Sequence, residues 1–301
     1  MGKRTLTGAV ILLVVAGFIA LVPISPYFFD FLVMAITFVS VYELLKVYNS
    51  NNPKCSKAYI YLSISYAYVI YCIYAFVKAT SFKKILFQVT AFGCYFIIAF
   101  IFDLIYLAKV RDREDIEITP DDHLLCTKLT LKTMLYPTTL LGTLYGLNSF
   151  NSNYFSMWLL ILVFSVTIFT DVFAYLFGIT FHKGKFASQI SPNKSMSGAI
   201  GGLFGGLVAA TIVMGISYFW GILNPFTAHK MWKVILFFAL SGLIGSLSCE
   251  FGDLVASSVK RKYGIKDYGK IFPGHGGMMD RVDGLMFCST STYILVLLLF
   301  F

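Results

Sequence analysis

Charged and polar side chains gather in one stretch of this chain, between Ser257 and Asp283. Only 13% of all residues are charged, yet this stretch holds five Lys or Arg before the turn at Pro273, then one Arg, and three Asp. Glycines surround His275, and glycine-rich backbone exposes N–H groups that can bind phosphate oxygens. Long hydrophobic runs flank the stretch on both sides. These residue types predict a site for a phosphate-bearing ligand.

Two acids, a hydroxyl and an ammonium group lie just upstream at helical spacing. Their positions step by three, four and three residues, which puts them on one stripe of a helix: Glu250, Asp253, Ser257 and Lys260. The solvated end of a helix can show the same stripe. The two acids, however, lie in the apolar part of the run, which a purely solvated face does not require.

Asp280 and Asp283 open the last hydrophobic run. Acids are favoured at a helix N-terminus by the dipole alone, so N-capping is one explanation of both. Metal binding is the other, because Mg²⁺ prefers oxygen ligands and usually takes one or two carboxylates together with substrate phosphates. The nearby Lys and Arg side chains would neutralise a polyphosphate.

A further acid, Asp171, lies in the middle of an apolar run and shares a helical face with Thr167 and Tyr175. A basic segment follows, with Lys183, Lys185, Ser191 and Lys194. An acid in a membrane segment is costly and marks a functional or paired site. A metal or phosphate site and a buried ion pair both fit this pattern.

The hydrophobic runs that must position these residues are long enough to cross a membrane. The chain has 301 residues, 58% of them hydrophobic, and a mean hydropathy of +0.77. Runs of 18 or more apolar residues predict transmembrane helices. The first run lacks a clear cleavage site, so we expect it to be retained as a span. We therefore expect an all-α polytopic membrane protein with about nine spans, over residues 6–22, 27–45, 58–77, 85–108, 132–147, 154–179, 199–221, 232–256 and 284–301.

The distribution of positive charge predicts the orientation. With the N-terminus inside and the C-terminus outside, roughly four in five of the 24 Lys and Arg residues lie in inner segments. This bias explains the net charge of +9 without a nucleic-acid partner. The six cysteines form no CxxC pair, which predicts buried side chains and neither a disulfide framework nor a metal cluster.

The stretch from Ser257 to Asp283 resembles the full signature of the phosphatidate cytidylyltransferases, also called CDP-diacylglycerol synthases. The matching positions are Ser257, Val259, Lys260, Arg261, Lys266, Asp267, Gly269, Phe272, Pro273, His275, Gly276, Gly277, Met278, Asp280, Arg281, Val282 and Asp283. Upstream, Asp171 to Gly178, Ile190 to Gly198 and Gly252 to Leu254 resemble other blocks of that family. The resemblance covers roughly the C-terminal half. It departs at Met196–Ser197, where the family usually has an acid.

The resemblance implies that CTP and phosphatidic acid react to give CDP-diacylglycerol and pyrophosphate. It implies Mg²⁺ as the cofactor, and a second metal ion is a further option. It implies a metal site at Asp253 and Asp280, with Asp171 and Asp283 as further ligands or supports. The catalytic residues it implies are Lys260, Arg261, Lys266, Asp267, His275 and Arg281. The substrate-binding residues it implies are Lys183, Lys185, Ser191, Lys194, Ser257, Gly276 and Gly277.

Two other functions remain open at this point. A transporter would also have intramembrane carboxylates and glycine-broken helices, although here the charges cluster at one interface and no repeat is visible. A CTP-dependent enzyme acting on another lipid phosphate is the second, because the signature describes the nucleotide end of the reaction.

We expect one integral membrane domain, with residues 1–150 as a lipid-facing scaffold and residues 151–301 carrying the site on the cytoplasmic side of the plasma membrane. The glycines from Gly198 to Gly206 predict close helix packing in lipid. That packing can lie within one subunit or in a homodimer.

Overall fold

The computed structural model describes residues 2–51, 58–77, 80–111, 120–150, 153–181, 184, 194–220, 231–272, 274 and 276–300. Within these ranges the regular secondary structure is helical, and Phe272 and Gly276 form an isolated bridge in the loop that follows α10. The all-α expectation is therefore confirmed. The helices are α1 (Gly2–Leu21), α2 (Pro26–Asn51), α3 (Ala58–Phe76), α4 (Ser81–Arg111), α5 (Pro120–Thr133), the π-helical turn η1 (Met134–Thr139), α6 (Leu140–Asn148), α7 (Asn153–Phe181), α8 (Met196–Phe219), α10 (Met231–Lys262) and α11 (Met279–Phe300).

Six helical segments in the described ranges are long and apolar enough to cross a membrane. They are Pro26–Tyr48, Lys83–Phe102, Tyr154–Phe181, Met196–Phe219, Met231–Lys262 and Met279–Phe300. Two shorter apolar helices cover Leu6–Leu21 and Tyr61–Phe76. Many large apolar side chains on these helices are exposed, among them Phe96, Ile97 and Phe100 on α4. Such surfaces suit lipid and would be unusual in water, so the chain is an integral membrane protein.

The predicted span at 132–147 is divided in the structure among α5, η1 and α6. Pro137 lies inside η1, and the preceding Tyr136 has non-helical backbone angles. Proline lacks the N–H that would continue the helical ladder, and its ring displaces the carbonyl one turn earlier. The interruption therefore follows from the residue that made this run the least regular in the sequence.

The glycines of α8 let three helices approach closely. A Cβ on Gly205 would lie 2.5 Å from the carbonyl oxygen of Phe169 on α7, and one on Gly206 would lie 2.6 Å from that of Gly242 on α10. The predicted close packing is confirmed, and it lies within one chain. In this part of the molecule α7 packs along α8, and α10 packs against both α8 and α11.

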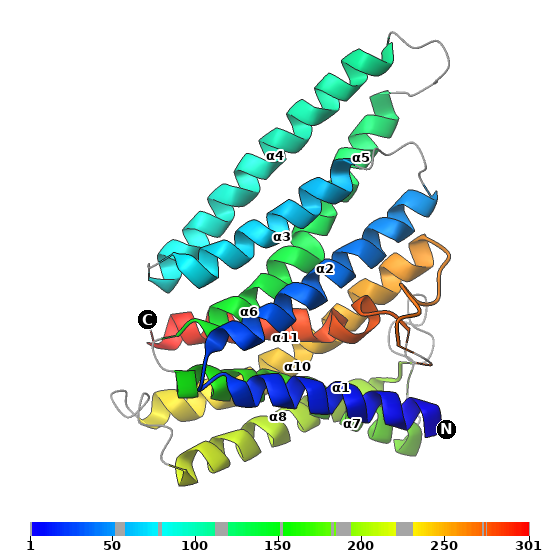
Figure 1. Cartoon of the computed structure of the whole chain (residues 1–301). Helices are drawn as coiled ribbons and strands as arrows, with labels where there is room; N and C mark the ends of the chain where they lie inside the picture. Colours follow the sequence, from blue (N-terminus) through cyan, green and yellow to red (C-terminus); the bar gives the residue numbers. More distant parts are fainter. Residues whose placement is uncertain are drawn as a thin grey trace.

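The α10–α11 connection lies at one end of the bundle, the end where α1 begins, and α11 finishes at the opposite end (Figure 1). The C-terminal part of α2 reaches the same end as this connection (Figure 1). The fold thus brings the charged stretch of the sequence against helices from both halves of the chain.

Candidate active site

The end of α10 turns sharply into the charged loop. Gly264 has a φ of +65°, and its N–H donates to the Arg261 carbonyl at 3.2 Å. The N–H of Ile265 donates to the Lys260 carbonyl at 3.0 Å. Glycine adopts this left-handed conformation without steric cost, which makes it the usual residue just after a helix. Three basic residues lie in the last turn of α10, where the helix dipole favours positive charge: Lys260, Arg261 and Lys262.

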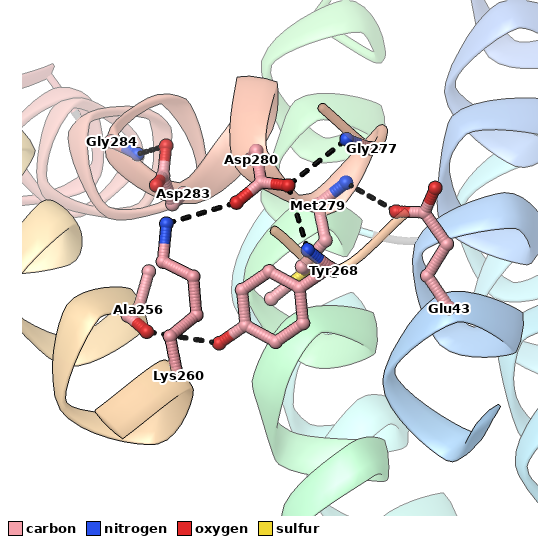
Figure 2. A network of polar contacts seen from close by, with 9 residues as sticks. All are labelled: Glu43, Ala256, Lys260, Tyr268, Gly277, Met279, Asp280, Asp283 and Gly284. Carbon is pink, nitrogen blue, oxygen red and sulfur yellow. Dashed lines mark hydrogen bonds and ion pairs between the residues drawn. The ribbon is translucent and has the colours of Figure 1, made fainter. Parts of the chain in front are cut away.

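Asp280 is the centre of the loop's hydrogen-bond network (Figure 2). Its Oδ1 lies 2.9 Å from Nζ of Lys260, and its Oδ2 accepts the N–H groups of Tyr268 and Gly277, each at 2.9 Å. Asp280 is only 8% exposed. One carboxylate therefore joins the end of α10, the middle of the loop and the first turn of α11.

Tyr268 connects the loop to α10 through its side chain. Its ring is 4% exposed and lies 5.7 Å from Nζ of Lys260, within range of a cation–π interaction. Its hydroxyl donates to the Ala256 carbonyl at 3.1 Å. Burial raises the pKa of the Tyr268 hydroxyl above its usual value, and the charges of Asp283 and Asp280 act in the same direction. The hydroxyl therefore stays neutral and remains a donor.

A second ion pair joins the start of α8 to α10. Nζ of Lys194 lies 3.0 Å from Oδ2 of Asp253 and donates to the Glu250 carbonyl at 3.4 Å. The next residue, Ser195, is the N-cap of α8, and its hydroxyl accepts the Gly198 N–H at 3.0 Å. The Lys194 block and the 250–260 stripe, which are far apart in the sequence, thus meet at one place.

Three carboxylates from three helices lie in electrostatic range of one another. Asp253 on α10 interacts with Asp171 on α7 and with Asp283 on α11. The helices approach closely here, since a Cβ on Gly284 would lie 3.4 Å from Oδ1 of Asp253. Within the described residues, no three His, Cys, Asp or Glu side chains are already arranged around a single metal position. What the fold provides is a cluster of carboxyl groups next to Lys194.

Of the remaining predicted residues, some lie in the described part of the chain and others lie outside it. Arg261, Lys266, Asp267 and Arg281 are exposed around the loop, and the charge of Arg281 acts on Asp171. Ser257 is half-buried on α10. Gly276 has a φ of +83°, which explains glycine at that position. His275, Lys183, Lys185 and Ser191 lie outside the described residues.

The structure adds two residues that the sequence analysis did not assign to the site. Tyr268 lies inside the recognised stretch, but nothing in the spacing marked its ring as the support of Lys260. Glu43 lies on α2, and its Oε2 accepts the Met279 N–H at 2.9 Å (Figure 2). The only signal for Glu43 was an acid within an apolar run, which local patterns cannot connect to a residue 236 positions away.

Comparison with known proteins decides the family. A family model described as the cytidylyltransferase family matches residues 2–299, almost the whole chain. The chain belongs to the cytidylyltransferase family.

Three curated relatives of this chain carry the name phosphatidate cytidylyltransferase. The relative from Thermotoga maritima is 37% identical over 134 residues, which cover 44% of this chain and 47% of the relative. Those from Brucella abortus and Rickettsia bellii are 38% identical over 139 residues and 36% identical over 136 residues, covering 45% of this chain in both cases and 45% and 56% of the relatives. The chain thus spans about half the length of the curated relatives it matches.

Proposed function

We propose that this cytidylyltransferase transfers CMP from CTP to phosphatidic acid, giving CDP-diacylglycerol and pyrophosphate. The observation that carries the proposal is the joint placement of the Lys260–Asp280 pair and the acids around Asp253 at one end of a membrane bundle. Family membership and the name of the relatives support the same reaction.

In the proposed reaction an oxygen of the lipid phosphate attacks the α-phosphorus of CTP. The bond between that phosphorus and the oxygen bridging to the β-phosphate breaks, and pyrophosphate leaves with the electron pair. Phosphatidic acid is already an anion, so no general base is needed. Such a transfer depends mostly on positioning and on neutralising charge.

Cationic side chains around the loop suit the triphosphate. We assign Lys260, Arg261 and Lys266 to the phosphates of CTP and to the departing pyrophosphate. Lys194, just before α8, pairs with Asp253, and we assign it to the lipid phosphate or to the nucleotide. Arg281, which is exposed at the start of α11, supplies further positive charge.

The carboxylates fit the Mg²⁺ ion that this reaction implies. Asp171, Asp253 and Asp283 would hold it, because they bring hard oxygen donors from three helices to one region. Mg²⁺ takes only part of its ligands from protein when phosphates supply the rest, so a complete protein cage is not required. When bound, the ion would neutralise charge on the CTP phosphates. Asp280 accepts three hydrogen bonds within the loop, so we assign it to holding the loop in place.

The topology that suits this function has nine spans, with the N-terminus and the site on the cytoplasmic side of the plasma membrane. The six long apolar helices account for six of these spans, and α1, α3 and the combined α5–α6 segment would be the other three. An odd number of spans is supported by the positions of the chain ends, because α1 begins at one end of the bundle and α11 finishes at the opposite end (Figure 1). Phosphatidic acid would enter sideways between helices, with its phosphate at headgroup depth. A cysteine placed at Gly274 tests this topology, because it should react with impermeant reagents only from the inside.

The lipid specificity is tested with purified protein in detergent, CTP and Mg²⁺. Parallel reactions contain phosphatidic acid, an archaeol-type ether lipid phosphate or a polyprenol phosphate. We expect a CDP-lipid only, or at least tenfold faster, with phosphatidic acid. A preference for another lipid phosphate would show that phosphatidic acid is not the substrate. If none of the three lipids gave a liponucleotide, the proposed activity would be refuted. The prediction of a homodimer stays a prediction, since the α8 glycines pack within one chain.

A further inference from the structure

Glu43 is a buried carboxylate that belongs to the N-terminal half of the chain. It lies near the end of α2 and is 3% exposed. A buried carboxylate is costly unless hydrogen bonds or a cation compensate it. Its Oε2 accepts the backbone N–H of Met279 at 2.9 Å. The partner is thus a backbone group at the start of α11, and Figure 2 shows the Glu43 carboxylate facing that backbone.

Met279 is the first residue of α11. The first four N–H groups of a helix have no acceptor within the helix, and they carry the positive end of its dipole. A cap usually comes from the residue just before the helix. Here the charge and the acceptor come from another helix, 236 residues earlier. Glu43 therefore stabilises the start of α11 at a position set by α2.

Two glycines of the loop make room for this carboxylate. A Cβ on Gly269 would collide with Oε1 of Glu43, and a Cβ on Gly277 would collide with both carboxylate oxygens. Neither residue is among the glycines with positive φ, so backbone conformation does not require glycine at these positions. The lack of space does: the Glu43 carboxylate is the nearest neighbour at both positions, and at Gly277 the backbone nitrogen of Gly269, 2.6 Å from such a Cβ, adds to the crowding. This contact is independent of the hydrogen bond to Met279, and it ties both sides of the loop to α2.

The position of α11 decides where its charged side chains lie. Asp280, Arg281 and Asp283 follow directly after the residue that Glu43 holds. Asp280 separately accepts the Gly277 and Tyr268 N–H groups, so the two carboxylates hold the same part of the loop through different groups. Resting on the function proposed above, we propose that Glu43 is a positioning residue for cytidylyl transfer: it holds the loop between Gly269 and Met279 against α2 and thereby sets the placement of the α11 acids.

The first test measures amide hydrogen exchange in the purified protein without substrate. Glu43→Ala should lose protection at residues 276–280, whereas Glu43→Gln, which keeps an acceptor oxygen, should retain most of it. The matched control is Asp30→Asn, which changes another buried carboxylate on α2 about 20 Å away along the helix. It should leave protection at 276–280 unchanged. Full protection in Glu43→Ala would overturn the inference.

The second test measures turnover of CTP and phosphatidic acid. Glu43→Ala should lower kcat by about 10- to 100-fold with little change in KM for the lipid, because small misplacements of reacting groups are costly. Glu43→Gln should recover most of that loss. Equal loss in both variants, with the loop still protected, would indicate a direct chemical role and contradict positioning.

A third variant keeps the inference testable if Glu43→Ala does not fold. Gly269→Ala should reduce protection and kcat in the wild-type background, while Gly215→Ala on α8, where a Cβ meets nothing within 4 Å, should not. In the Glu43→Gln background the effect of Gly269→Ala should persist. If Glu43→Ala does fold, Gly269→Ala should add little to it, because the collision is gone; additive losses would refute the contact.

These readouts separate the two proposals. If the wild-type protein makes no CDP-lipid but Glu43→Ala loses loop protection as expected, only the proposed function fails. If the wild type is active and Glu43→Ala is both protected and equally active, only the positioning role fails.

Discussion

Nζ of Lys260, in the last turn of α10, lies 2.9 Å from Oδ1 of Asp280, in the first turn of α11. The pair joins the two ends of the loop, and among the described residues between them Tyr268 and Gly277 donate their N–H groups to the same carboxylate. The side chain of Asp280 is 4% exposed and that of Lys260 is 20% exposed. This ion pair is therefore shielded from water more than a surface pair would be.

Breaking that pair should cost both stability and turnover. We expect Lys260→Met to destabilise the protein by about 3 kcal/mol, because it leaves the Asp280 charge without its cation. Asp280→Asn should abolish turnover and also lower the melting temperature. Thermal unfolding in detergent measures the first effect and CTP turnover the second.

The control for this pair is Lys270→Met, which removes an exposed lysine of the same loop and should change stability by less than about 0.5 kcal/mol. In the double variant Lys260→Met/Asp280→Asn, the two stability losses should be less than additive. Additive losses would show that the two side chains do not interact in solution.

Tyr268 should contribute through its hydroxyl as well as its ring. Tyr268→Phe keeps the ring beside Lys260 and removes the donor to the Ala256 carbonyl, so we expect a loss of about 1 kcal/mol in unfolding free energy. The exposed Tyr61, at 72% exposure, provides the control Tyr61→Phe with no loss. The pKa of Tyr268 is raised in the folded state, so its contribution is complete below its usual pKa of 10.0 and declines only as pH rises above it. A difference between wild type and Tyr268→Phe that already vanishes between pH 6 and 9 would contradict this assignment.

The contact between α8 and Glu250 can be tested with two glycines of one helix. A Cβ on Gly202 would collide with Oε1 of Glu250 and lie 3.2 Å from a methyl carbon of Thr170, whereas a Cβ on Gly215 meets nothing within 4 Å. Gly202→Ala should therefore destabilise by about 1–3 kcal/mol. Gly215→Ala should be neutral or stabilise by up to about 1 kcal/mol. Equal melting temperatures for the two variants would argue against the packing of α8 on α10.

The acids that we assign to Mg²⁺ should show themselves in a metal titration. Chelation by EDTA should stop turnover, and added Mg²⁺ should restore it. Asp253→Asn and Asp283→Asn should raise the Mg²⁺ concentration needed for half-maximal turnover by tenfold or more. Asp30→Asn, at the opposite end of α2 from the loop, should leave that concentration unchanged. An unaltered Mg²⁺ requirement in both site variants would show that Asp253 and Asp283 do not bind the metal.

Much of the fold follows from hydropathy, because a transmembrane helix is a local pattern. The helices lie over the predicted spans, and the one irregular span contains Pro137. The charged stretch and the stripe through Asp253 and Lys260 were also visible as local composition and spacing. Their roles in catalysis stay predictions.

The contacts between distant segments had no such signal. The pairing of Lys194 with Asp253 joins two blocks 59 residues apart, and the contact of Glu43 with Met279 joins the two halves of the chain. Both depend on how helices pack in three dimensions. The groups that donate to Oδ2 of Asp280 are likewise backbone N–H groups, and every residue except proline carries the same N–H, so residue types could not identify them.

The transfer of the α-phosphate tests the central claim most directly. Purified protein is incubated with phosphatidic acid, Mg²⁺ and CTP labelled at either the α- or the γ-phosphate, and the lipid and aqueous products are counted separately. Cytidylyl transfer predicts that α-label enters the lipid and γ-label leaves as pyrophosphate. Label from the γ-position in the lipid, or no labelled lipid from either, would contradict the account.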